Sequence, residues 1–380
     1  MAGVDSLVVH VNAAGAVMGG AARHLPAFVS ALTAARPGWR IRLELSGELD
    51  RGSLPPGVEV RLTGRRSHPG RVLYESTTLV REARRADVLL NLTNSGPLWS
   101  ATPSILYQRN ALWFDRAWLA STGPRVRAEA AVRRALAFAQ MRAAAVTIVP
   151  SHAMAGLVRD WREAPRGARI EVVPHAVDQE AFPFRSRPWP PPDRRVRLLM
   201  VSHAAEHKDQ ALVIELTARL RRLGWDASGA LTVAPQDAPG YVDRLQRRVH
   251  ELGLGSSVQF LGRSSDVASL LAGADVFVFA SRSESFGFPV VEAMAVGVPV
   301  VAADIPATRE LTAGLGWLFP PGDVGQAAER VAEVLAVPAD AMHERLRRAS
   351  GAVRGLTWEA NAASVAEIVE GCVSGRARQA

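Results

Sequence analysis

Short apolar segments rich in Val, Ile and Leu alternate with longer amphipathic segments along the chain. In the first half, seven of the apolar segments predict β-strands, at 6–12, 40–46, 58–62, 86–92, 104–108, 145–151 and 170–175. The stretches between them predict helices, most clearly at 21–35, 71–85 and 125–143. Near-continuous apolar strands that alternate with helices are typical of parallel sheets with helices on both faces.

The alternation breaks once and then restarts. Residues 183–193 contain five prolines in eleven positions, and because neither a helix interior nor a central strand tolerates this, an interdomain linker is predicted there. Beyond it, strands are predicted at 195–202, 229–234, 258–262, 275–281 and 298–304. Helices are predicted at 209–223, 241–252, 289–296, 323–336, 339–353 and 358–372.

A chain of 380 residues is long enough for two such domains. We therefore predict an α/β protein with two doubly wound parallel-sheet domains, residues 1–183 and residues 184–357. Ligands of such sheets bind beyond the carboxyl ends of the strands, so a binding site is expected in a cleft between the domains.

The composition is that of a globular protein, with 48% hydrophobic and 22% charged residues. No apolar run reaches the roughly 18–20 residues that span a bilayer. The N-terminal segment has no basic region ahead of its apolar stretch, so we interpret it as a first strand and not as a signal peptide. The single cysteine, Cys372, cannot form an internal disulfide, which fits a cytoplasmic location.

The charge is unevenly distributed. Residues 1–190 carry 25 arginines and 15 acidic residues, a net charge of +10, while the remaining residues carry 20 basic and 22 acidic ones, a net of −2, which together give +8. A basic half suits phosphate-bearing substrates, anionic lipid or nucleic acid, although a solvated arginine-rich surface explains most of these residues. No zinc-finger, RNP-like or helix-turn-helix pattern accompanies the charge, so no nucleic-acid partner is expected.

One lysine, Lys208, stands among 44 arginines. A compact ammonium differs from a planar guanidinium fork and can approach clustered phosphate oxygens more closely. In a chain that uses arginine wherever a generic cation suffices, this lysine suggests a specific role at a phosphate group. Composition alone leaves open a surface lysine without function.

The segment 281–300 is the most informative part of the sequence. An apolar strand leads into a polar turn with Glu284, then into Gly287 and Pro289, and then into a helix that carries Glu292. Proline suits the first helical turn, glycine lets backbone approach a ligand, and free amides at a helix start bind anions. Carboxylates on both sides of such amides suit a phosphorylated sugar, whereas each glutamate taken alone could be an ordinary surface residue.

These segments resemble the retaining family-4 glycosyltransferases. Glu284 and Glu292 match that family's E-x7-E motif, and the residues that follow, to Val301, are similar as well. The stretch 198–216 resembles the family's strand, loop and helix with G-R-x4-K, in which Lys208 occupies the lysine position. The segments 258–263, 273–281 and 314–323 are similar to the family as well, so that the resemblance covers most of residues 190–330. In the first half only looser similarity is found, at 18–25 and 172–182.

The resemblance implies a GT-B fold, in which two Rossmann-like domains face an interdomain cleft and a C-terminal helix, here about 358–380, packs back on the first domain. It implies that Lys208 holds the donor diphosphate and that Glu284 contacts the donor sugar, both as catalytic residues. Glu292 would bind the ribose hydroxyls and Arg263 would lie near the base. The remaining donor-binding residues implied are Gly19, Gly20, Ser202, His203, Ser285, Phe286, Gly287 and Phe288.

Two departures from the family pattern affect the site. The family's phosphate-binding arginine is His203 here, after Ser202 instead of glycine, so a fixed positive charge is replaced by a group that is neutral when unprotonated. Many members also carry a histidine in the first domain, where this chain has Gln108, Arg109 and Asn110. These three are candidates for the acceptor side, and an ordinary turn after a strand explains them equally well.

The resemblance implies transfer from a UDP-, GDP- or dTDP-sugar to the hydroxyl of a small-molecule, glycan or lipid-linked acceptor, with retention at the anomeric carbon. Negative charge then grows on the leaving diphosphate, which Lys208 and the amides at 285–288 would stabilise. The leaving phosphate would accept the acceptor's proton. The chain has no D-x-D motif, so neither a metal nor another cofactor is expected.

Several alternatives remain open. A nucleotide-sugar epimerase or a phosphorylase could use the same fold, and a basic protein that binds polyanions or a membrane surface is a more remote possibility. Peripheral contact with the inner face of the membrane is compatible with the basic first half. A dinucleotide-dependent dehydrogenase is disfavoured because the loop at 13–24 lacks G-x-G-x-x-G. Glycan or natural-product biosynthesis is the expected setting.

Overall fold

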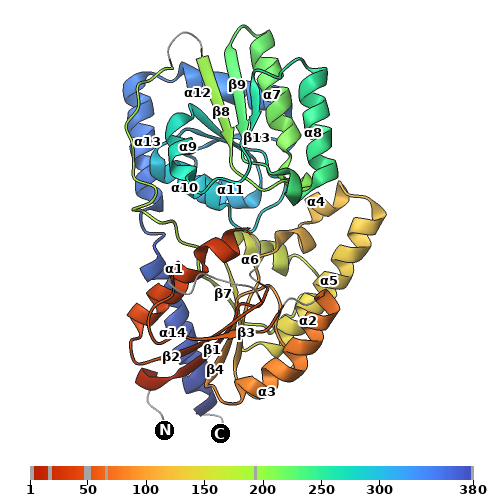
Figure 1. Cartoon of the computed structure of the whole chain (residues 1–380), viewed down its shortest axis with the longest axis vertical. Helices are drawn as coiled ribbons and strands as arrows, with labels where there is room; N and C mark the ends of the chain where they lie inside the picture. The colour runs from red at the N-terminus through yellow and green to blue at the C-terminus, as the bar shows by residue number, and fades with distance from the viewer. Residues whose placement is uncertain (1–3, 16–18, 47–52, 65–66, 192–194, 378–380) are drawn as a thin grey trace. The chain divides into compact units, whose positions relative to one another are not determined.

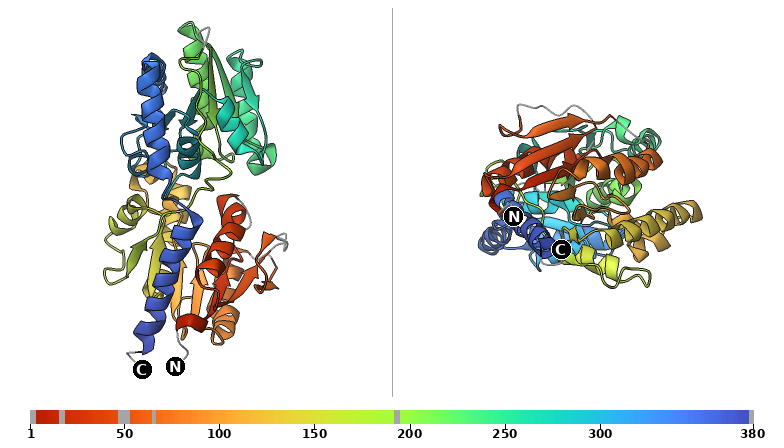
Figure 2. Two further views of the ribbon diagram at one scale, coloured as in Figure 1. Left: turned by 90° about the vertical axis from the view of Figure 1, so that its left-hand side faces the viewer. Right: turned by 90° about the horizontal axis from the view of Figure 1, so that it is seen from below.

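The computed structural model describes residues 4–15, 19–46, 53–64, 67–191 and 195–377. The chain divides into two compact units, one of Met1–Ala176 with Leu356–Ala380 and the other of Val177–Gly355. Each unit has its own parallel sheet covered by helices on both faces (Figure 1, Figure 2). The predicted α/β fold with two doubly wound parallel sheets is confirmed.

Unit 1 contains a seven-stranded sheet in the order β3-β2-β1-β4-β5-β6-β7. Its strands are β1 Val8–Asn12, β2 Arg40–Leu45, β3 Glu59–Leu62, β4 Val88–Asn91, β5 Ser104–Tyr107, β6 Val146–Val149 and β7 Ile170–Val172. The main helices are α1 Gly19–Ala35, α2 His68–Tyr74, α3 Val80–Ala83, α4 Arg116–Ala120, α5 Pro124–Ala143, α6 His152–Arg159 and α14 Trp358–Ala377. A π-helical turn, η3 Glu75–Leu79, joins α2 to α3, and the 3-10 turns η1 Val4–Ser6 and η4 Ala111–Trp113 complete the unit.

Helix α14 returns from the end of the chain to unit 1 and lies along α1 (Figure 1). Its apolar residues Ala362, Val365 and Val369 are fully buried in one core with α1 and the sheet. Asn361 Nδ2 donates to the carbonyl of Pro174 at 2.6 Å. The last helix is therefore part of the first unit's core.

Unit 2 contains a six-stranded sheet in the order β10-β9-β8-β11-β12-β13. Its strands are β8 Arg195–Met200, β9 Asp226–Leu231, β10 Val258–Phe260, β11 Val276–Phe279, β12 Val300–Ala303 and β13 Trp317–Phe319. Its helices are η6 Glu206–Lys208, α7 Gln210–Arg222, η7 Pro235–Asp237, α8 Pro239–Glu251, α9 Val267–Gly273, α10 Phe288–Val296, α11 Pro306–Thr312, α12 Val324–Ala336 and α13 Ala339–Val353.

The proline-rich segment, where a linker was expected, is packed on unit 2 over its described part. Phe184 lies against Gly297, the amide of Arg185 donates to the carbonyl of Val296 at 2.9 Å, and Trp189 is buried in the unit's core. Proline suits such an extended segment because the segment needs few of its own amide donors. The division between the units falls at Ala176 and Val177, ahead of the expected position after residue 183.

Several elements differ from the sequence-based expectations. Strand β13 was not predicted, and neither were the short helices α6, α9 and α11. Strand β9 begins at Asp226, three residues before its predicted start, because it pairs in register with β8 from Arg195 to Met200. Gly229 occurs in this strand because a Cβ there would lie 2.8 Å from Thr217 Oγ1 of the covering helix α7. Tertiary packing overrides local strand propensity at this point.

Candidate functional site

The strand order of unit 2 reverses direction between β8 and β11, which are neighbours in the sheet. Open parallel sheets of this type bind ligands at such a switch point, beyond the carboxyl ends of the two strands. The loop after β8 carries Ser202, His203 and Lys208, and the loop after β11 carries Glu284. The sequence candidates of unit 2 thus meet where the fold favours a ligand.

Lys208 and Glu284 form an ion pair between Nζ and Oε1. Their side chains are only 13% and 15% exposed, so solvent screens the pair less than it would a surface pair. The two residues are 76 positions apart in sequence and belong to different loops, so this contact exists only in the folded unit. It joins the chain's only ammonium side chain to the first glutamate of the motif.

Further contacts hold the two loops together. The amide of Arg282 donates to the carbonyl of His207 at 2.8 Å, and the guanidinium of Arg282 pairs with Asp209 at 2.8 Å. Asp209 adopts a left-handed conformation with φ 55°, which turns the chain from η6 into α7. Sequence reasoning did not find Arg282 and Asp209, because an arginine and an aspartate beside a motif carry no signal of their own.

Gln210, the first residue of α7, holds the loop after β8 in place through side-chain hydrogen bonds. Its Nε2 donates to Ser202 Oγ at 2.9 Å and to the carbonyl of His203 at 2.8 Å. The amide of Ser202 donates to Thr232 Oγ1 at 3.0 Å. These bonds preorganise the segment that the sequence analysis assigned to the donor, and Gln210 is a further positioning residue that the motif did not reveal.

The electrostatics of the site centre on Lys208. Burial alone raises the pKa of Glu284, but the Lys208 charge, together with His207 and Ser281, outweighs burial and lowers it. Desolvation and the same ammonium lower the pKa of His203. At neutral pH Glu284 is therefore a carboxylate and His203 is neutral, and the loop after β8 contains no arginine that would add a fixed positive charge.

His207 supplies a pH-dependent contribution to stability. Burial and the Lys208 charge lower the pKa of His207 to about 4, from an ordinary value of 6.5. The unfolded chain therefore binds a proton between pH 6.5 and 4 that the folded chain does not, so the free energy of unfolding falls as the pH falls through this range. We expect a loss of about 1–3 kcal/mol, allowing for the solvent contact that the ring retains.

Urea unfolding of the wild type and of His207→Gln between pH 4 and 7.5 measures this contribution. The difference in free energy of unfolding between the two proteins should be constant above pH 7. As the pH is lowered, the wild type should lose more stability than the variant. If the difference in free energy of unfolding stayed constant down to pH 4, His207 would be readily protonated in the folded protein.

Helix α10 begins at Phe288, shortly after Glu284 in the sequence. Gly287, the residue before it, has φ 135°, and a Cβ there would lie 3.2 Å from Leu311 Cδ1. Pro289 lies in the first helical turn, as its missing amide hydrogen predicts. Glu292 is 2% exposed in this helix, whose residues from Val290 to Val296 are all buried. The carboxylate of Glu292 thus belongs to a helix that is buried along most of its length.

The other donor candidates differ in their surroundings. Phe286 is buried and its ring meets that of Phe288 edge-on, with centroids 5.6 Å apart, while Ser285 precedes them in the same turn. Arg263 is well exposed and pairs with Asp237, with Nε 3.0 Å from Oδ1. Gly19 and Gly20 begin α1 of unit 1, and their approach to a diphosphate remains a prediction.

The acceptor-side candidates lie at the end of β5 in unit 1. Gln108 is fully buried, and its Oε1 accepts from the amide of Asn110 at 3.2 Å. Asn110 Oδ1 caps the turn η4 by accepting from Leu112 at 3.0 Å. Both side chains therefore shape the turn, as the alternative interpretation proposed. Arg109 remains partly exposed.

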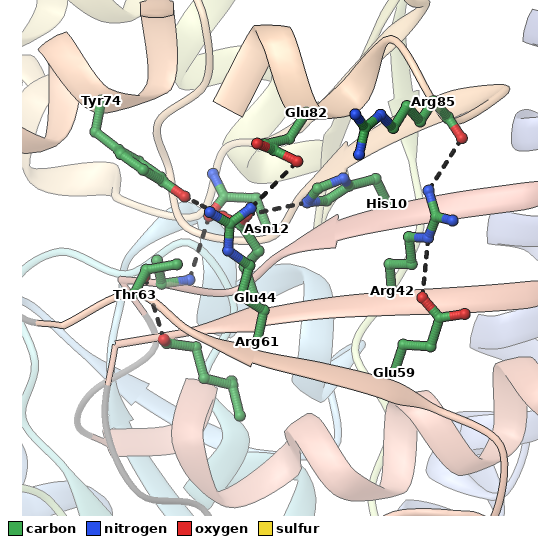
Figure 3. Close-up of polar contacts among 12 residues, drawn as sticks. His10, Asn12, Arg42, Glu44, Glu59, Arg61, Thr63, Tyr74, Glu82 and Arg85 are labelled. Carbon is green, nitrogen blue, oxygen red and sulfur yellow. Dashed lines mark hydrogen bonds and ion pairs between the residues drawn. The ribbon is translucent and has the colours of Figure 1, made fainter. Parts of the chain in front are cut away.

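A separate polar hollow of about 340 Å³ lies over β1, β2 and β3 of unit 1. Figure 3 shows that its charged side chains face one another. His10 Nε2 lies 3.3 Å from Glu44, Arg61 lies 3.7 Å from Glu44 and 3.4 Å from Glu82, and Arg42 binds Glu59 at 3.0 Å. Inward-facing charges protect an edge strand from pairing with other chains. This mutual pairing favours a structural role for the hollow.

Neither a metal-binding cluster nor a membrane-spanning helix is found in the described part of the chain. Within it, no group of three or more His, Cys, Asp or Glu side chains has an arrangement that could hold a metal ion. None of the helices described there is both long and apolar enough to cross a membrane.

Two doubly wound parallel-sheet units define the GT-B fold class, and solved structures of glycosyltransferases share this arrangement. A glycosyltransferase from Rickettsia africae aligns over 97% of this chain and 99% of its own, with a TM-score of 0.74 and 15% identity. The Anabaena protein HepE in complex with UDP and glucose aligns over 98% and 99%, with a TM-score of 0.68 and 19% identity. At these identities the similarity shows the fold.

Sequence comparison identifies a family match that lies within unit 2. Residues 182–351 match the family model "Glycosyl transferases group 1". The D-inositol 3-phosphate glycosyltransferase of Frankia alni is 32% identical over 218 residues, 52% of each chain. The phosphatidyl-myo-inositol mannosyltransferase of Mycobacterium tuberculosis is 28% identical over 232 residues, 59% of this chain and 60% of that protein. The chain thus spans between half and two thirds of the length of these relatives.

Proposed function

We propose that this chain is a retaining glycosyltransferase that moves a sugar from a nucleoside diphosphate sugar to an acceptor hydroxyl without a metal ion. The observation that carries the proposal is the Lys208–Glu284 pair at the β8/β11 switch point, directly ahead of the start of α10. The match of residues 182–351 to the glycosyltransferase model supports it. So does the UDP bound to the similarly folded Anabaena protein.

In this mechanism the donor separates the pair. The diphosphate takes the Lys208 ammonium, while Glu284 accepts hydrogen bonds from hydroxyls of the sugar. Glu292 binds the ribose, and the amides from Ser285 to Phe288 face the sugar and diphosphate. Each partner exchanges one ionic or polar contact for another, so separating Lys208 from Glu284 costs little free energy when the donor binds. As the glycosidic bond breaks, Lys208 and the amides stabilise the charge that develops on the leaving diphosphate.

The acceptor is positioned by unit 1, and the leaving phosphate takes its proton, so no protein base is required. Domain closure would align the acceptor hydroxyl and exclude water. A cytoplasmic location, with or without peripheral contact with the membrane, is part of this proposal because a single cysteine suits a reducing compartment. The expected products belong to glycan or natural-product biosynthesis.

A thermal-shift comparison of UDP-, GDP- and dTDP-sugars tests donor binding. At a concentration 100 times its Kd, the preferred donor should stabilise the protein by about 2.7 kcal/mol, which corresponds to a rise in Tm of about 5–10 °C. EDTA should leave this shift unchanged. If none of the three donors raised the Tm, the donor assignment would be wrong.

Product analysis separates the related enzymes. A transferase consumes the donor only with an acceptor, an epimerase changes it without one, and a phosphorylase requires free phosphate. The anomeric configuration of the product, determined by NMR, tests retention. The remote alternative of polyanion binding predicts tight, steeply salt-dependent binding without affinity for nucleotide sugars. The pairing of Arg42 and Arg61 with glutamates reduces the free positive charge available for that function.

A further inference from the structure

The sheet of unit 1 also has a switch point, between the neighbouring strands β1 and β4. Gly15 follows β1 and Thr93 follows β4. A Cβ added at Gly15 would lie 2.5 Å from Arg71 Nη1 and 3.0 Å from Thr93 Cβ. The three residues are therefore packed against one another, and glycine is needed at position 15 for the guanidinium to lie there.

Arg71 has few polar partners among the residues that the structure describes. Among the described residues its ionic contact is with Glu75, where Nε lies 3.8 Å from Oε1, which is too long for a hydrogen bond. Arg71 Nε is buried without a hydrogen-bond partner in that part of the chain. Glu75 is also engaged by Asn12 Nδ2 at 3.3 Å and by Ser95 Oγ. The carboxylate near Arg71 is therefore shared with two other donors.

Arg109 is a second cation nearby, and within the described part of the chain it makes one side-chain hydrogen bond. One of its nitrogens, Nη2, donates to the carbonyl of Leu92, the residue before Thr93. Its guanidinium lies over the Tyr107 ring at 5.9 Å, and no described carboxylate lies within ion-pair distance of it. Asn94, with φ 58°, fixes the backbone of Arg109 by accepting from its amide at 2.5 Å. Burial lowers the pKa of Arg109, as expected for a cation without a counter-ion.

Two hydroxyl groups in this region are buried and unsatisfied. Thr93 is 5% exposed and Tyr107 is 3% exposed, and neither Oγ1 nor the phenolic oxygen has a hydrogen-bond partner among the described residues. Folded proteins rarely leave buried polar groups unpaired, and such groups call for an explanation. Thr93 lies near Gly15, where Arg71 also lies, and follows Leu92, whose carbonyl accepts from Arg109, so the residue adjoins both arginines.

We propose that Gly15, Arg71, Thr93 and Arg109 form an anion subsite that binds a phosphate group of the acceptor, so that the acceptor is a phosphorylated polyol. The inference rests on the proposed function, in which unit 1 holds the acceptor. Two neighbouring guanidinium groups and a hydroxyl supply several hydrogen-bond donors, which suits the oxygens of a phosphate. The two relatives described above are named for acceptors that contain a phosphorylated inositol.

The same chemistry could come from a free phosphate monoester or from a lipid headgroup, and calorimetry on the full chain distinguishes them. The probes are D-myo-inositol 3-phosphate, uncharged myo-inositol, and phosphatidylcholine vesicles with and without phosphatidylinositol. Binding of the soluble phosphate in preference to myo-inositol, or of the phosphatidylinositol vesicles in preference to plain ones, supports the subsite and identifies the source. If neither phosphate-bearing probe binds better than its uncharged or plain counterpart, the inference is overturned.

The variants Arg71→Gln and Arg109→Gln should each weaken binding of the better probe by about 10- to 100-fold, the loss expected for a hydrogen bond to a charged group. Arg133→Gln, at an arginine of α5 that pairs with Glu129, is the matched control and should bind normally. A UDP titration of each protein shows whether the donor site is intact. In the variants, normal UDP binding together with weakened phosphate binding supports the subsite. A wild-type protein that binds UDP but does not prefer either phosphate-bearing probe would leave the proposed function standing without this subsite.

Thr93→Val separates a ligand-binding role from a structural one. Because the hydroxyl has no partner among the described residues, its removal should leave Tm unchanged or raise it, while phosphate binding weakens several-fold. A structural role predicts the opposite pattern, in which Tm falls and binding of the folded fraction is retained. That pattern, or normal phosphate binding by both Thr93→Val and Arg109→Gln, would overturn the proposal.

Discussion

Replacing Lys208 with alanine is expected to lower kcat/KM by about 30- to 1,000-fold, which corresponds to about 2–4 kcal/mol of transition-state stabilisation. In the proposed donor site the ammonium is the main cation, since the loop after β8 contains no arginine and the pKa of its His203 is lowered by burial and by Lys208. No second fixed charge in the loop after β8 can take over its role. Initial-rate kinetics with the preferred donor measure the effect.

The loss should appear mainly in kcat, because Lys208 is proposed to stabilise charge that develops only as the glycosidic bond breaks. Lys208→Arg keeps the charge and should retain part of the activity. The activity lost relative to the wild type measures how well a guanidinium replaces the compact ammonium. Arg244→Gln, at an exposed arginine of unit 2 that pairs with Glu206, is the control. Near-normal turnover of Lys208→Ala would refute the catalytic assignment.

Removing Lys208 also leaves Glu284 without its counter-ion, so stability must be measured alongside activity. A partly buried carboxylate that loses its partner is destabilising, and a fall in Tm is expected for Lys208→Ala. The double variant Lys208→Ala/Glu284→Gln should recover much of that stability but none of the activity. Recovery of both would indicate that the pair is structural.

Gly287→Ala is expected to destabilise unit 2 by about 1–3 kcal/mol and to weaken donor binding at the same time. The backbone at Gly287 has φ 135° and ψ 62°, a conformation that costs roughly this much for a residue with a side chain. The added methyl would also lie 3.2 Å from Leu311 and 3.6 Å from Phe279. Relief of this strain would move the turn that aims the amides of residues 285–288.

Thermal unfolding and nucleotide titration measure both effects of Gly287→Ala. Gly351→Ala is the matched control, because Gly351 is an exposed residue of α13 with no heavy atom within 4 Å of the added Cβ. Alanine is the better helix former, so this control should be neutral or stabilise by up to about 1 kcal/mol. A Gly287→Ala protein with unchanged Tm and donor affinity would show that the turn tolerates a side chain.

Much of the fold could be predicted from the sequence because strand and helix periodicities are local properties. Apolar strands such as 276–279 and the helix at 339–353 contain the signal within their own residues. Strand β13 could not be found in this way, since three residues carry too little pattern and its pairing partner β12 is required to define it. The membership of α14 in unit 1 likewise depends on packing against α1.

The sequence alone pointed to Lys208 by its uniqueness and to Glu284 and Glu292 by their spacing around a glycine and a proline. Only the tertiary structure decided that Lys208 and Glu284 contact each other, because residues 76 positions apart meet through the pairing of β8 with β11. It also decided that Arg71, Thr93 and Arg109 adjoin one another with donors that have no partner among the described residues, which no spacing along the chain reveals. Residue type and local periodicity determine which groups are available, while strand order determines which of them share a site.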